Sequence, residues 1–273
     1  MDLTIVALYT ISDDLLISIG HKQHPQAKMS DAEVMTAALV AARYFRGNQQ
    51  TACAVLKTLG YIPNMLGHSR FNRRLHRIPE LFQVLFEYLA AGAKAKNPNG
   101  IYVIDSFPIP VCDNIRISRS RLYQGEVWRG KIASKHRYFY GIKGNLMVTE
   151  TGEIVEVFFT PGRWNDVQGL RSYRFDLPEG SSVYADKAYC SYGVEDALQE
   201  AGIFLKPLRK KNSKRQYPPW EVYLQQLTRK RVEVSISLIE QLLPKSIHAV
   251  SARGFELKVL LFVIATSIKQ LFG

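Results

Sequence analysis

The chain has 273 residues, of which 47% are hydrophobic and 22% charged, values that are typical of a folded globular protein and exclude a mainly disordered one. Its 36 Lys and Arg residues against 24 Asp and Glu residues leave a formal net charge of +12. The excess is uneven, because residues 201–273 hold 13 basic and 4 acidic side chains, whereas residues 100–200 hold 12 and 13. This asymmetry fits a polyanion such as nucleic acid as a partner, although a generally basic soluble surface would also produce it.

Cysteine usage and hydropathy indicate the cellular compartment in which the chain folds. Cys53, Cys112 and Cys190 are far apart and form no zinc-binding spacing, which indicates a reducing compartment. The N-terminus lacks the basic region of a secretory signal. The most apolar run, residues 259–268, is too short to cross a bilayer and predicts a core helix. We therefore expect a soluble, cytoplasmic protein.

The first 92 residues predict helices only. Apolar residues recur at helical spacing over residues 3–19. Ser30 and Glu33 form a capping-box pattern ahead of an alanine-rich helix that runs to about Phe45. A third helix is expected over residues 48–59, and one or two more over residues 69–91, with Pro79 as the point of division.

The segment 69–77 carries four arginines in nine residues. Together with residues 48–59 it could form a helix–turn–helix pair that contacts DNA through Arg70, Arg73 and Arg74. A solvated basic face of a helical bundle explains the arginines equally well.

A turn-rich linker at residues 94–100 separates this region from one that is rich in strands. We place one domain at residues 1–96 and a second at residues 100–273. The second begins with a strand that ends at Asp105, followed by a loop that contains Pro108 and Pro110 and by a basic stretch at residues 116–137.

The remaining elements alternate between strands and helices. They are expected to be a hairpin of residues 138–149 and 153–160, a helix from Asn165 to about Phe175, a strand that ends at Asp186, a helix at 194–201, a strand at 203–205, a basic loop at 206–215, and helices at 222–243 and 255–271. One sheet with helices around it is an α/β arrangement.

Two short apolar runs, residues 101–105 and 183–186, each end in an aspartate. A carboxylate at the end of a buried strand must be solvated, paired with a cation or bound to a metal, because an unpaired buried charge is costly. With Glu233 on a late basic helix, Asp105 and Asp186 make a possible three-carboxylate site. Hard oxygen ligands suit Mg²⁺, and three carboxylates can hold two divalent ions about 4 Å apart for attack on a phosphodiester.

Plainer explanations exist for the same residues. Asp186 could cap a turn or pair with Lys187, and Glu233 could belong to a surface ion pair. Glu240 lies two turns beyond Glu233 on the same flank of the helix and is the main rival for the third ligand position. We favour Glu233 because Arg229 precedes it by four residues.

Three motifs carry a resemblance to a known family. Val-Ile-Asp-Ser around Asp105, Tyr-Ala-Asp-Lys-Ala-Tyr around Asp186, and Arg-x-x-x-Glu at residues 229–233 resemble the DDE transposases of bacterial insertion sequences. The compact group of insertion sequence nine-eight-two is the most similar. The helical N-terminal part, the segment 159–166 and the tail 246–250 are also similar, so the resemblance covers most of the chain.

The sequence departs from that pattern in two places. Some relatives place a Tyr three residues before the Arg and a Lys seven residues after the Glu, where this chain has Gln226 and Glu240. The basic stretch 116–137 also replaces the short hairpin of a minimal ribonuclease H fold, and we interpret it as an insertion that contacts DNA.

The resemblance implies a ribonuclease H-like, mixed-sheet catalytic domain after an all-helical domain, with Asp105, Asp186 and Glu233 as the catalytic residues and as ligands of two Mg²⁺ ions, for which Mn²⁺ would substitute. It implies a transposase that cuts double-stranded DNA at terminal inverted repeats and joins the 3′-hydroxyl ends to target DNA. We expect at least a dimer on DNA, in the cytoplasm at the nucleoid.

The side chains expected to contact DNA are basic or aromatic, and several have a structural alternative. Trp164 could be packed, and the lysines of 206–215 could be part of a solvated loop. The predicted set is Arg70, Arg73, Arg74, Arg129, Lys131, Arg163, Trp164, Lys187, Lys210, Lys211 and Arg229.

Two other functions fit the same residues. A structure-specific nuclease of the same fold would use the three carboxylates without strand transfer. A catalytically inactive DNA-binding regulator would keep the basic surfaces and lose the metal.

Overall fold

The computed structural model describes residues 2–132 and 136–272, and it divides into two compact units. One unit is discontinuous in sequence and consists of Met1–Tyr88 with Leu238–Gly273, and the other is Leu89–Ser237. The predicted division differs at the C-terminal end, where residues from Leu238 onward group with the N-terminal helices and not with the sheet. No helix of the described residues is both long and apolar enough to span a membrane.

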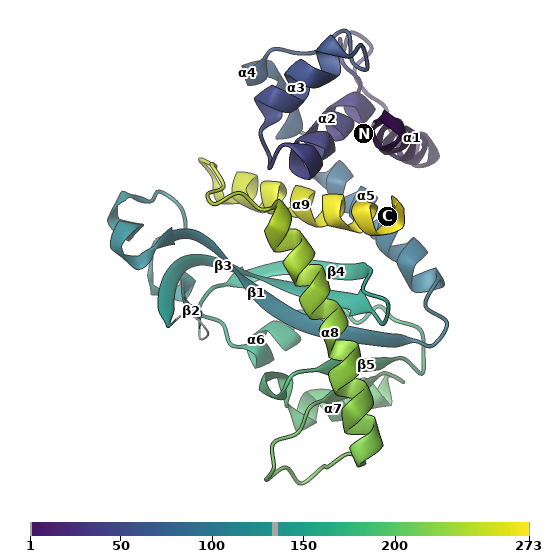
Figure 1. Cartoon of the computed structure of the whole chain (residues 1–273), viewed down its shortest axis with the longest axis vertical. Helices are drawn as coiled ribbons and strands as arrows, with labels where there is room; N and C mark the ends of the chain where they lie inside the picture. The colour runs from purple at the N-terminus through teal and green to yellow at the C-terminus, as the bar shows by residue number, and fades with distance from the viewer. Residues whose placement is uncertain (1, 133–135, 273) are drawn as a thin grey trace. The chain divides into compact units, whose positions relative to one another are not determined.

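Among its described residues, the first unit contains helices and no strand, as predicted for its N-terminal part (Figure 1). Its helices include α1 (Asp2–Ser18), α2 (Asp31–Tyr44), α3 (Gln49–Thr58), α4 (His68–Leu75) and α9 (Ala252–Phe272), and α5 (Pro79–Ala95) begins in it. The predicted capping box is present, because Ser30 Oγ accepts from the Glu33 N–H at 3.0 Å and Glu33 Oε2 accepts from the Ser30 N–H at 2.6 Å. The proline at residue 79 is where α5 begins.

The core of this unit lies between α2 and α9. α2 is buried from Asp31 to Ala42 with the single exception of Glu33, and α9 is buried through most of its length. Gly47, with φ +79°, follows α2 closely against the ring of Phe262, where a Cβ atom would lie only 2.9 Å from Cζ. This close approach explains why the last helix belongs with the first ones.

The second unit is built on a six-stranded mixed sheet. Its strands are β1 (Ile101–Asp113), β2 (Arg129–Ile132), β3 (Arg137–Thr149), β4 (Ile154–Pro161), β5 (Ser182–Ala185) and β6 (Phe204–Pro207). β3 pairs antiparallel with β1, β2 and β4, whereas β5 is parallel to both β1 and β6. The strands β1, β3 and β4 are antiparallel, and β5 and β6 follow as parallel strands on the other side of β1. This is the ribonuclease H-like arrangement that was predicted.

The helices of this unit connect and cover the strands. They are α6 (Asp166–Leu170), α7 (Tyr192–Glu200) and α8 (Pro219–Leu242), which begins in this unit. α8 crosses one face of the sheet (Figure 1). Ser235 Oγ on α8 donates to the Gly152 carbonyl in the β3–β4 turn at 2.6 Å, and Lys206 on β6 pairs with Glu221 in the first turn of α8 at 2.8 Å.

Two local predictions were wrong. The loop expected at Pro108 and Pro110 is strand, since both residues pair with β3. Beyond Val103, β1 pairs with β3 alone, so alternate N–H groups face away from the ladder and proline costs no hydrogen bond there. The helix expected up to Phe175 ends at Leu170, and Phe175 itself has φ +51°, which is not helical.

Candidate active site

The parallel register of β1 and β5 brings two carboxylates to one end of the sheet. Ile101 pairs with Ser182 and Val103 with Tyr184, a constant offset of 81 residues. The same offset sets Asp105 opposite Asp186, which directly follows β5. Asp186 occupies the N-cap position of the short 3₁₀ helix η4 (Lys187–Tyr189), but its side chain makes no capping hydrogen bond.

Arg229 on α8 joins these aspartates to the third predicted carboxylate. Its guanidinium lies 3.4 Å from Asp186 Oδ1, 3.8 Å from Asp105 Oδ2 and 3.9 Å from Glu233 Oε1. The Arg229 side chain is only 15% exposed, whereas that of Glu233 is 60% exposed. The structure thus gathers all three predicted carboxylates around one cation. Glu240, the rival, is exposed and lies seven residues further along the helix.

Asp105 is the most buried of the three carboxylates. The pKa of Asp105 is raised to about 6, chiefly by burial and also by the neighbouring Asp166 and Asp186, while the Ser106 N–H and Arg229 act in the opposite direction. The Ser106 N–H donates to Asp105 Oδ1 at 2.8 Å. A nearby cation stabilises the ionised form of a buried carboxylate and so lowers its pKa.

Asp166 is a neighbour of the site that the sequence interpretation missed. Its Oδ1 accepts from Ser106 Oγ at 3.0 Å and from Lys143 Nζ at 3.3 Å. The Asn165–Asp166 pair was interpreted only as a helix cap, and Asn165 does cap α6, with its side chain accepting from the Gln168 N–H. Asp166 instead ties α6 to the residue that follows Asp105.

The side chains of the site supply oxygen donors that suit a divalent metal ion. Within residues 2–132 and 136–272, no three His, Cys, Asp or Glu side chains lie close enough together to hold a metal ion as they stand. The donor chemistry nevertheless fits, since three carboxylates face one cationic group, and carboxylate oxygens are the ligands that Mg²⁺ and Mn²⁺ prefer. A metal ion held by all three would take the place of the Arg229 guanidinium.

Comparison with known proteins identifies the family. A family model described as a transposase DDE domain matches residues 95–249, more than half of the chain. The chain belongs to this family.

A solved structure supports the fold of the DDE transposase. It is described as a cryo-EM structure of the piggyBac transposase synaptic complex with hairpin DNA, and it matches with a TM-score of 0.52 over 97% of this chain and 73% of that chain. The sequence identity is 11%, so this likeness concerns the fold alone. No curated protein matches the chain in sequence.

The predicted DNA-contacting arginines of the transposase's α4 differ in their surroundings. Arg70 and Arg73 are exposed. Arg74 donates to Asp31 Oδ1 through Nη2 at 2.8 Å and Nε at 3.1 Å, and His21 contacts the other oxygen of Asp31 at 2.9 Å. Asp31 is nearly buried, so Arg74 neutralises a buried charge at the start of α2, a structural role.

The inserted basic stretch is partly structured. It contains the 3₁₀ helices η1 (Asn114–Arg119) and η2 (Glu126–Trp128) and strand β2, and its residues 133–135 lie outside the described residues. Arg129 pairs with Glu126 at 3.5 Å and lies over the ring of Tyr138, and exposed Lys131 lies near the same ring.

The remaining predicted contacts lie near the ends of β4, β5 and β6. Arg163 and Lys187 are exposed, and Trp164 is half-buried. Lys210 and Lys211 are exposed on the loop after β6.

Proposed function

We propose that the chain is a DNA transposase that cuts at the terminal inverted repeats of an insertion sequence and joins the 3′-hydroxyl ends to target DNA. The observation that carries this proposal is the convergence of Asp105, Asp186 and Glu233 on the Arg229 guanidinium at one end of the mixed sheet. Membership of the transposase DDE domain family supports it.

The three carboxylates would hold two Mg²⁺ ions, with Mn²⁺ as a substitute. When bound, the ions would supply an activated water or 3′-hydroxyl and would stabilise the attacking and leaving oxygens of an in-line displacement. The Ser106 N–H and hydroxyl hold Asp105 and Asp166 in place. Arg229 and Lys187 would offset negative charge that develops on the phosphate.

The partner is double-stranded DNA, as terminal repeat and as target. The exposed arginines Arg70 and Arg73 of α4 would contact the repeat, and Arg129, Lys131, Arg163 and Trp164 would contact DNA near the sheet. Since an element has two ends, we expect at least a dimer on DNA. The protein would act in the cytoplasm, at the nucleoid.

The decisive experiment compares cleavage of a labelled duplex that carries the element's end, in Mg²⁺ or Mn²⁺, by the wild type, Asp186→Asn, Glu233→Gln and Glu240→Gln. Loss of one charge-stabilising group should lower the cleavage rate about a hundredfold or more in the first two variants. Glu240→Gln is the matched control, because it removes an exposed carboxylate from the same helix.

Other results would redirect the interpretation. Loss of cleavage in Glu240→Gln with cleavage kept in Glu233→Gln would make Glu240 the third ligand. Cleavage without strand transfer or preference for the repeat would indicate a structure-specific nuclease. A wild type that binds the end, binds no Mn²⁺ by isothermal titration and never cuts would be a DNA-binding regulator.

A further inference from the structure

The loop that follows β6 begins beside the candidate active site. The Leu208 N–H donates to the carbonyl of Ala185, the residue before Asp186, at 2.9 Å. The Leu208 carbonyl accepts from Cys190 Sγ at 3.3 Å. The loop comprises residues 208–218. Its first residue is therefore hydrogen-bonded to Ala185, which precedes Asp186 in the sequence, and to Cys190, which follows it.

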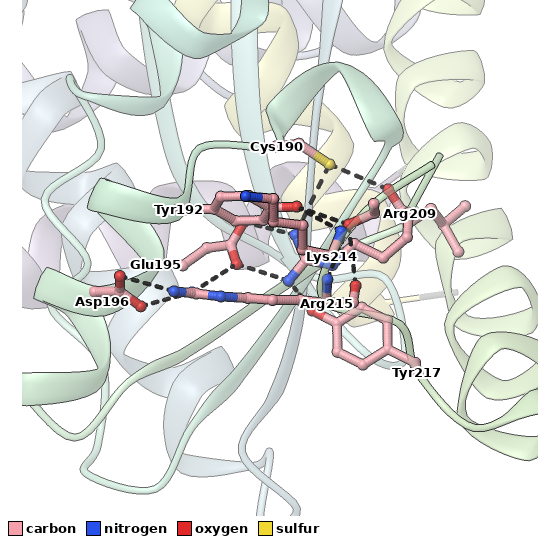
Figure 2. Close-up of polar contacts among 10 residues, drawn as sticks. Cys190, Tyr192, Glu195, Asp196, Arg209, Lys214, Arg215 and Tyr217 are labelled. Atoms are coloured by element: carbon pink, nitrogen blue, oxygen red, sulfur yellow. Dashed lines mark hydrogen bonds and ion pairs between the residues drawn. The ribbon is translucent and has the colours of Figure 1, made fainter. Parts of the chain in front are cut away.

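A nearly buried ion pair holds the next residue of the loop (Figure 2). Arg209 donates to Glu195 Oε1 at 2.8 Å and to Oε2 at 2.6 Å, a bidentate pair in which the side chains are 5% and 6% exposed. Arg209 also donates to the Tyr217 hydroxyl at 2.8 Å and lies over the rings of Tyr217 and Tyr192. This buried bidentate pair fixes the orientation of the loop relative to α7, because separating the two side chains would leave a buried charge without a partner.

The far side of the loop is held by a second set of contacts. Arg215 makes a bidentate pair with Asp196 at 2.6 and 2.9 Å and lies over the Tyr192 ring (Figure 2). Gln216 Nε2 donates to the carbonyls of Lys210 and Ser213, each at 3.0 Å, and to that of Lys211 at 3.4 Å. The loop is thus held to α7 at both ends, and the carbonyl groups of Lys210, Lys211 and Ser213 accept hydrogen bonds from within the loop.

These contacts separate the basic side chains of 206–215 into two groups. Lys206, Arg209 and Arg215 are paired with acidic residues. Lys210, Lys211 and Lys214 are exposed, and none of them forms an ion pair with another described residue. Three unneutralised cations on a loop fixed next to Asp186 favour a polyanion as the partner.

We infer that Lys210, Lys211 and Lys214 form a preformed phosphate cradle for the DNA strand that crosses the Asp105–Asp186 end of the sheet, and that Glu195 and Arg209 position this cradle. The inference rests on the proposed function and names a surface of the same site. Lysine contacts to phosphate require no particular base sequence, so the cradle serves any strand brought to the carboxylates.

The test measures the affinity of full-length protein for a duplex of arbitrary sequence at several salt concentrations. Each lost phosphate contact makes the plot of log K against log salt shallower by about 0.9, so changing the three lysines to alanine should reduce the slope by about 2.7. The control triple variant, Lys22→Ala, Lys28→Ala and Lys96→Ala, removes the same charge from exposed positions elsewhere and should leave the slope close to that of the wild type.

The positioning role of the ion pair is tested by Glu195→Gln, which keeps the shape of the side chain and removes its charge. We expect a shallower salt slope and faster hydrogen exchange at residues 210–216, with Mn²⁺ binding by isothermal titration unchanged. Exchanging the charges in the double variant Glu195→Arg, Arg209→Glu should restore part of the slope. A slope equal to that of the wild type in Glu195→Gln would overturn the positioning role.

The triple lysine variant also separates this inference from the proposed function. A reduced slope supports the cradle even if no DNA end is ever cut, whereas cleavage by the wild type with an unchanged slope overturns the cradle alone. Loss of poly-L-glutamate binding with DNA binding kept would assign the loop to an acidic protein segment and would also overturn it.

Discussion

Arg229 contacts three carboxylates without forming a close pair with any of them. Its distances of 3.4, 3.8 and 3.9 Å contrast with the 2.6 and 2.8 Å of the Arg209–Glu195 pair. The single positive charge of the guanidinium therefore offsets only part of the negative charge of Asp105, Asp186 and Glu233, and each carboxylate keeps room for a stronger partner.

We expect Arg229→Gln to bind Mn²⁺ more tightly than the wild type, because the variant removes the cation that competes for the same oxygens. If the competition is worth about 1 kcal/mol, as for a partly exposed ion pair, the affinity should rise about fivefold. Isothermal titration measures this, and Arg231→Gln, which changes an exposed arginine of the same helix, is the control. Weaker binding in Arg229→Gln would show that the arginine organises the ligands.

A second prediction concerns His76, which lies against the first turn of α9, with its Cε1 close to Gly254. Burial lowers the pKa of His76, and Lys258 and Arg253 lower it further. The unfolded chain, with a histidine pKa of about 6.5, then binds the proton more readily than the folded one, so stability is full above about pH 6.5 and falls as the pH drops below it.

We therefore expect the difference in thermal unfolding temperature between pH 7.5 and pH 5.5 to be smaller in His76→Gln than in the wild type. His24→Gln, at an exposed histidine between α1 and α2, serves as the control. An unchanged difference in His76→Gln would mean that the acid sensitivity has another source.

At the scale of elements, Gly162 joins the end of β4 to the inserted stretch. Its N–H donates to the Gly141 carbonyl, and a Cβ atom at Gly162 would lie 2.7 Å from the Trp128 carbonyl oxygen and 3.2 Å from the Gly130 nitrogen. Since these neighbours are backbone atoms, they cannot move aside independently of their strands.

Gly162→Ala should accordingly lower the free energy of unfolding by about 2 kcal/mol, in the range of overpacked sites, and speed hydrogen exchange over residues 127–131. Gly193→Ala on α7, where the added Cβ meets nothing within 4 Å, should be neutral or stabilising by up to about 1 kcal/mol. Equal destabilisation by the two substitutions, measured by urea unfolding, would contradict this account.

Sequence patterns predicted most elements, because their signals are local. The Ser30–Glu33 capping box and the β3–β4 hairpin depend on residues a few positions apart, and both are present. The strand that continues through Pro108 and Pro110 could not be predicted, since the tolerance for proline depends on which neighbour β1 has there.

The candidate site shows the same limit. Asp105 and Asp186 were predictable because each ends an apolar run, and Glu233 because of its spacing from Arg229. The contacts of Asp166, Glu195 and Arg209 were not predictable, since they join segments that pairing in the sheet brings together.

At the scale of the whole molecule, the helical unit is assembled from both ends of the chain. The sequence boundary was placed by composition, which changes near residue 97, whereas the last helix has no composition that marks it as a partner of α2. A fragment of residues 1–96 would therefore lack the helix that covers one side of α2.

We expect residues 1–88 fused through a flexible linker to residues 238–273 to melt cooperatively, and at a higher temperature than residues 1–96 alone. Circular dichroism during heating measures this. The core between α2 and α9 supplies the reason, since its apolar side chains would otherwise face water. Equal melting of the two fragments would show that the N-terminal helices need no C-terminal partner.

The packing of α9 on α2 also has a consequence for synthesis. Domains generally fold as units while the ribosome is still extending the chain, with the N-terminal ones first. Here the N-terminal helices emerge before the sheet but lack their partner until α9 has been made, and α9 follows all six strands in the chain, so the apolar surface of α2 stays uncovered while the strands are being synthesised. The sheet, whose strands are contiguous in the chain, is free to form in the meantime, so the helical unit is begun before the sheet and completed after it.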